Sequence, residues 1–75
     1  MKKDNKYIEI MEAYNVKYKT KVRIIDESVI VPPGALSVNQ NDVVTIFKVD
    51  GMYCNGINAN NERIYIAAWT NVEII

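Results

Sequence analysis

The stretch that decides the fold is Asp42-Val43-Val44-Thr45-Ile46-Phe47-Lys48-Val49-Asp50-Gly51-Met52-Tyr53-Cys54. Its first half alternates with the two-residue period of a strand, with Val44 and Ile46 on one face. Asp50-Gly51 follows, and glycine tolerates the positive φ that tight hairpin turns require. Beyond the turn the alternation resumes. The stretch therefore predicts a β-hairpin.

Three other segments carry the same alternation. Residues 16–25 place one row of side chains opposite a row of cations, Lys17, Lys19, Lys21 and Arg23. Residues 63–67 set Ile64 and Ile66 opposite Tyr65, and residues 72–75 form a last strand after a corner at 68–71. We therefore expect a mostly β protein, a small five-stranded antiparallel barrel, because closing a sheet removes its exposed edges.

The remaining segments connect or precede these strands. Residues 26–35 form a long loop, because Pro32, Pro33 and Gly34 are incompatible with a central strand. Residues 4–14 predict a short helix with Tyr7, Met11 and Tyr14 on one side and Asn15 ending it, although a strand over residues 7–10 is the alternative. We expect one domain over residues 1–75, with the helix at 4–14 and the barrel at 16–75.

Composition limits the setting and the partners. The 9 lysines and arginines balance 9 aspartates and glutamates, which argues against strong nonspecific nucleic-acid binding. A single cysteine and no signal peptide predict a reducing, cytoplasmic location, and no apolar run is long enough to predict a membrane span. The abundance of isoleucine, asparagine and lysine is typical of a low-GC bacterium or its phage.

From about residue 22 to residue 75 the order of segments resembles the Src-homology-3 fold: strand, long loop, hairpin, turn, strand, corner, final strand. The segments that carry the resemblance are Leu36-Ser37-Val38, Asn41-Asp42, Asp50-Gly51-Met52-Tyr53 and Asn71-Val72-Glu73. That family binds proline-rich peptides in an aromatic groove. At the five matching positions this chain has Ile25, Glu27, Met52, Ala68 and Asn71. The resemblance therefore implies the barrel and not the proline-peptide ligand.

The sequence carries no catalytic, metal-binding or cofactor-binding motif. It has no histidine, its three glycines are isolated, and one cysteine cannot build a zinc site. We expect Cys54 to pack as a small apolar residue beside Met52 on one face of a strand. The expected protein is therefore not an enzyme and holds neither a metal nor a cofactor.

The candidate contact residues are large apolar side chains, because aromatic residues dominate binding sites when exposed. They are Trp69, Tyr53, Met52 and Tyr65. Trp69 alternatively plugs one end of the barrel or receives the N-terminal helix. We expect a non-catalytic domain that binds a protein partner and has a regulatory role.

Two alternatives use the charges instead. A nucleic acid or an acidic partner would meet the basic strand through Lys17, Lys19, Lys21 and Arg23, with Tyr18 or Trp69 for stacking. Self-association would join the basic N-terminal part of one copy to an acidic surface of the next. Against both, four cations on a strand often only keep a face solvated.

Overall fold

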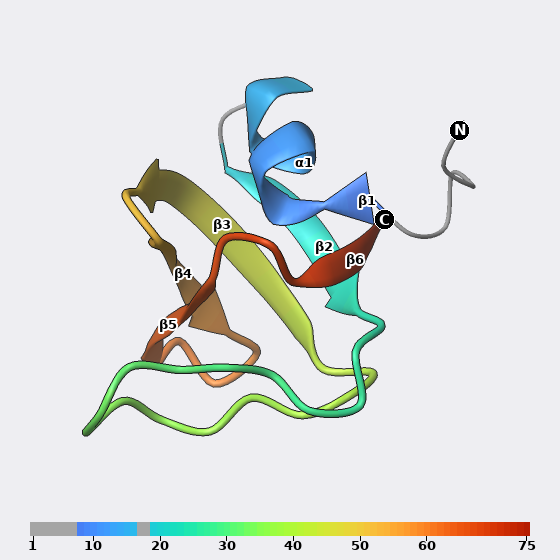
Figure 1. Cartoon of the computed structure of the whole chain (residues 1–75). Helices are drawn as coiled ribbons and strands as arrows, with labels where there is room; N and C mark the ends of the chain where they lie inside the picture. Colours follow the sequence, from blue (N-terminus) through green and yellow to red (C-terminus); the bar gives the residue numbers. More distant parts are fainter. Residues whose placement is uncertain (1–7, 17–18) are drawn as a thin grey trace.

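The computed structural model describes residues 8–16 and 19–75 (Figure 1). The mostly β prediction is confirmed, because the described residues form six antiparallel strands in one sheet and one short helix. The elements in chain order are β1 (Ile8–Glu9), α1 (Ile10–Val16), β2 (Thr20–Ile24), β3 (Val43–Asp50), β4 (Tyr53–Asn58), β5 (Arg63–Ala67) and β6 (Asn71–Ile74).

The strand order is β1-β6-β2-β3-β4-β5, and within the described residues no pairing joins β1 to β5. The sheet is therefore not closed, and the expectation of a closed barrel is wrong in this respect. The long loop occupies the end of the β5 edge instead, where the Ala67 amide donates to the Ile30 carbonyl at 2.9 Å. Pro32 and Pro33 follow after Val31, and prolines cannot donate to a strand ladder.

The predicted hairpin is present as β3 and β4, with Asp50 opposite Tyr53. The two residues between them are Gly51 and Met52, and Gly51 has a φ of 67°, as the first position of a type II′ turn requires. Met52 thus lies in the turn and is 65% exposed, so its expected place beside Cys54 on a strand face is wrong.

A β-bulge interrupts this hairpin, and the sequence did not reveal it. The register shifts between Ile46 and Lys48, which leaves Phe47 as the extra residue. After the bulge Val49, rather than Lys48, packs against the core. The alternation of Val43 to Ile46 therefore does not continue in phase to the turn.

The N-terminal helix is shorter and later than expected. Residues 8–9 form β1, which pairs with β6, and α1 begins at Ile10 and continues through Asn15 to Val16. The alternative strand is thus confirmed at these two residues, and the helical assignment there is wrong. Residues 4–7 lie outside the described part. Pairing with β6 supplies β1 with main-chain hydrogen bonds that an isolated short helix cannot secure.

The basic strand is also shorter than residues 16–25. Val16 belongs to α1, and Lys19 has a φ of 51°, a left-handed conformation incompatible with a strand. From Thr20 to Ile24 the alternation is confirmed, with Lys21 and Arg23 exposed and their neighbours buried. Lys17 and Tyr18 lie outside the described residues.

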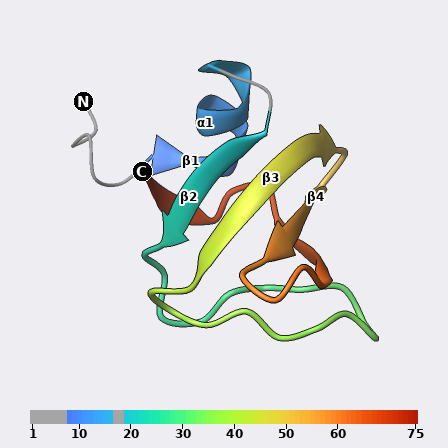
Figure 2. The ribbon, with the colours of Figure 1, turned by 180° about the vertical axis from the view of Figure 1, so that it is seen from behind.

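One hydrophobic core unites the strands with α1 and the long loop, and Ile8 of β1 packs against it. Its buried members are Ile10, Ala13, Val22, Ile24, Val38, Val44, Ile46, Cys54, Ile64, Ile66 and Val72. Figures 1 and 2 show α1 at one end of the sheet and the loop of residues 25–42 at the other. Val29 and Val31 of that loop pack against the core. The loop and the helix thus shield the core at its two ends.

Candidate functional site

Main-chain hydrogen bonds bring residues with large exposed apolar side chains to the turn that follows β5. The Ala68 amide donates to the Met52 carbonyl at 2.9 Å, and the Met11 amide donates to the Ala68 carbonyl at 3.3 Å. The neighbouring Ala67 amide donates to the Ile30 carbonyl. We call Met11, Ile30, Met52 and Trp69 the apolar corner; their exposed fractions are 48%, 52%, 65% and 43%.

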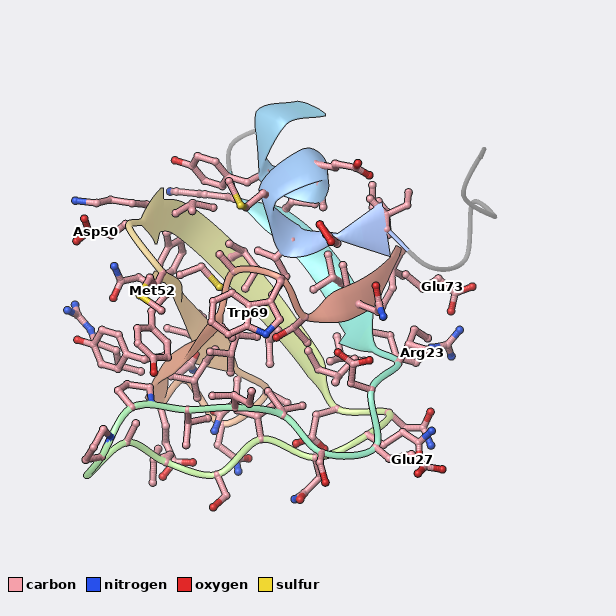
Figure 3. The ribbon with its side chains drawn as sticks, viewed as in Figure 1. Arg23, Glu27, Asp50, Met52, Trp69 and Glu73 are labelled. Carbon is pink, nitrogen blue, oxygen red and sulfur yellow. The ribbon has the colours of Figure 1, made fainter. Side chains whose placement is uncertain are left out.

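The turn itself explains why Trp69 faces outward. Thr70 donates to the Ala67 carbonyl through both its amide, at 3.1 Å, and its hydroxyl, at 2.6 Å. Ala68 and Thr70 are buried on either side of Trp69. In Figure 3 the indole lies over the front of the ribbon, and Met52 lies on the same side of the molecule. Trp69 therefore does not plug the core, so that alternative for its role is wrong.

The two candidate tyrosines lie on the neighbouring face of the β4–β5 pair. Tyr53 pairs with Ala67 and Tyr65 pairs with Asn55, so the tyrosines are diagonal neighbours on the face away from the buried Cys54 and Ile66. Both are half-buried. The structure thus brings the four predicted contact residues to one end of β4 and β5, with two in the corner and two beside it.

Sequence reasoning missed Met11 and Ile30 as surface residues. The helical pattern placed Met11 on the packed stripe, but a helix that begins at Ile10 buries Ile10 and Ala13 and leaves Met11 exposed. Ile30 sits in the loop, where no periodicity assigns a face. The Ala67–Ile30 hydrogen bond places it beside β5, and no local signal predicts that bond.

Two of the five positions singled out by the sequence resemblance, Ile25 and Asn71, serve the fold. Asn71 donates to Asp26 through its amide, at 2.8 Å, and through its side-chain nitrogen, at 3.2 Å. Its carbonyl accepts from Ile25 at 3.0 Å. These bonds fasten the start of the long loop to β6. Glu27 follows directly and is exposed.

The structure does not keep the predicted row of four cations together. Lys21 and Arg23 lie on the exposed face of β2, but Lys19 precedes the strand in its left-handed conformation. Arg23 pairs with Glu73 on the adjacent strand β6, as Figure 3 shows. Of the two cations on β2, Arg23 is thus paired with Glu73, and Lys21 has no such pairing within the described residues.

Cys54 is fully buried in the core, as expected. Burial disfavours the charged thiolate and raises the pKa of Cys54 from its ordinary value of 9.0 to about 12. A thiol with such a pKa is a poor nucleophile at neutral pH.

We expect this burial to make stability depend on pH. The unfolded thiol ionises above about pH 9 and the folded one does not, so alkaline pH favours the unfolded state. Relative to Cys54→Ala, the unfolding free energy of the wild type should fall by about 2 kcal/mol between about pH 8 and about pH 10.5. Denaturant titrations of both proteins measure this difference. Parallel pH dependences would contradict the assigned burial.

The described residues contain no group of three or more acidic or cysteine side chains that could hold a metal ion. A hollow of about 220 Å³ lies inside the long loop, and its lining residues are Glu27, Ser28, Val29, Val31, Ser37, Val38 and Asn39. No helix in the described part of the chain is long and apolar enough to cross a membrane. No protein-family model, curated protein or solved structure matches the chain.

Proposed function

We propose that this chain is a non-catalytic, cytoplasmic domain that binds a protein partner through the apolar corner. The observation that carries the proposal is that main-chain hydrogen bonds bring Met11, Ile30 and Met52 to the turn that holds Trp69, and all four side chains are exposed. Soluble proteins rarely expose several large apolar side chains in one region without a use, and tryptophan and methionine are enriched at binding surfaces.

The order of elements supports a Src-homology-3-like architecture for this domain. A strand (β2), a loop of residues 25–42, the β3–β4 hairpin, a turn, β5, a corner and β6 follow one another as in that family. The last strand returns to pair with β2. The apolar corner involves Met52 and the neighbour of Ala68, two of the positions at which the family's groove residues are replaced. We therefore propose that the binding site of this chain lies at a location related to the family's groove and accepts a different ligand.

The chemistry of the corner indicates what it would accept. Its methionines are flexible and polarisable and adapt to varied apolar shapes, while the indole of Trp69 offers a rigid surface. The main-chain groups at its base are already paired with one another. A partner would thus insert an apolar side chain rather than form main-chain hydrogen bonds there. We expect affinity to depend on a few contacts, as in other small interfaces.

The test compares capture by the wild type and by the double variant Met52→Gln, Trp69→Gln. Both residues are exposed, so the substitutions should change stability by less than about 1 kcal/mol. We expect a defined protein retained from a native lysate by the wild type to be lost by the variant, with at least tenfold weaker binding when that protein is purified. Isothermal titration calorimetry measures the difference.

The matched control is Leu36→Gln, which removes an apolar side chain of similar exposure, 45%, from the long loop. It should bind like the wild type. Equal loss in the control and the double variant would contradict a specific site at the corner. Light scattering separates self-association: a wild-type dimer that the double variant abolishes would make a second copy the partner.

A further inference from the structure

The charged side chains of the sheet are segregated by sign, although the net charge of the chain is zero. Strands β2 to β5 carry four cations, Lys21, Arg23, Lys48 and Arg63, and one carboxylate, Asp50. All four cations are exposed. The remaining described carboxylates lie on β1, β6, the helix, the turns and the long loop. One region of a chain with no net charge is therefore distinctly basic.

The strand register places these cations on one face, away from the core. Lys21, Thr45, Ile57 and Arg63 are opposite one another in a row that crosses β2, β3, β4 and β5. Strands lie about 4.8 Å apart, so this row spans about 14 Å between the Cα atoms of its two cations. Lys48, Asn55 and Tyr65 form a neighbouring row. We call these two rows the basic face; Figure 2 shows β2, β3 and β4 side by side.

Aromatic rings accompany the cations on this face. Tyr65 is in the row of Lys48, and Tyr53 is its diagonal neighbour. Both are half-buried, so their rings are held by packing and are partly open to solvent. Arg23 is occupied by Glu73, which leaves Lys21, Lys48 and Arg63 without a carboxylate partner among the described residues.

We propose that the basic face binds single-stranded nucleic acid. Cations spaced across a sheet can contact successive phosphates of a nucleic-acid strand, and tyrosines beside them can stack on its unpaired bases. A duplex would leave the tyrosines unused, because its bases already stack on one another. The register, rather than the row of lysines in the sequence, creates this site: Lys48 and Arg63 come from strands far from β2 in the chain.

Fluorescence anisotropy with a labelled oligothymidine of about 15 nucleotides tests the proposal. Three phosphate contacts on a single strand predict a slope of about −2 for log K against log salt. Affinity should thus fall about 50-fold from about 20 mM to about 150 mM sodium chloride. The variant Lys48→Gln, Arg63→Gln should weaken binding at least tenfold at low salt and reduce the slope to about −0.7.

The matched control is Leu36→Glu, Ser37→Glu, which changes the net charge by the same amount within the exposed long loop. It should retain wild-type affinity. Equal weakening in the control would overturn the site, since net charge alone would then explain binding. Equal affinity for polyglutamate or for duplex DNA, or no binding at low salt, would also overturn it.

A second measurement does not depend on the stability of any variant. Titration of the oligothymidine into the isotope-labelled wild type should shift the amide resonances of β2 to β5 and leave those of the apolar corner in place. Shifts confined to the corner would contradict the proposal. The Met52→Gln, Trp69→Gln variant should bind the oligonucleotide normally, so the failure of the protein-binding proposal would leave this one intact.

Discussion

Replacing Gly56 with alanine is expected to lower the free energy of unfolding by about 3 kcal/mol. We expect no other substitution that adds one methyl group to this protein to cost more. A Cβ at this position would lie 2.4 Å from the Thr45 carbonyl oxygen and 3.2 Å from the Ile46 side chain. The oxygen belongs to the backbone of β3 beside the bulge, so it cannot move without disturbing the β3–β4 ladder. The strands would have to separate locally.

The measurement is the melting temperature, together with a denaturant titration. A domain of this size typically has about 4–11 kcal/mol of total stability, so the variant should lose a large part of it. Its melting temperature should fall by about 12–24 °C. Gly34→Ala is the control: Gly34 has a φ of 83° and open space around it, so alanine costs only about 1 kcal/mol of backbone strain. Equal losses in the two variants would contradict the close approach.

The same bulge shows where prediction from the sequence stopped. The alternation of Val43 to Ile46 and the glycine at position 51 were sufficient to predict the hairpin, because period and turn chemistry are local. The bulge at Phe47 depends on how β3 meets Gly56 nine residues later, and no local signal reports that contact. The resulting phase shift moved Val49 to the core side.

The candidate site likewise combines features that local sequence predicts with features that it does not. Trp69 was a candidate contact residue because it lies in a corner, which is a local feature, but the sequence left open whether it is exposed or plugs the barrel. The partners of Trp69 were not predictable, because Met11 and Ile30 reach the corner through main-chain bonds from distant segments. The basic face has the same origin. Its cations come from β2, β3 and β5, and only the strand register decides that they share one surface.

The second large effect concerns α1, which the sequence placed too early in the chain. We expect Ile10→Ala to cost about 3 kcal/mol, because Ile10 is fully buried at the first position of the helix and its truncation leaves a cavity in the core. The Ile10 amide also donates to the Thr70 carbonyl at 3.1 Å, which fixes the side chain over the β6 end of the sheet. Helix and sheet should therefore unfold together.

Met11→Ala is the matched control, since it truncates the adjacent side chain, which is 48% exposed, and should cost less than about 1 kcal/mol. Guanidinium titrations of both variants provide the free energies and the m-values. A lower midpoint for Ile10→Ala with an unchanged m-value would indicate one cooperative unit that includes α1. Similar small losses in both variants would mean that α1 contributes little to the core, and the apolar corner would then lose Met11 as a fixed member.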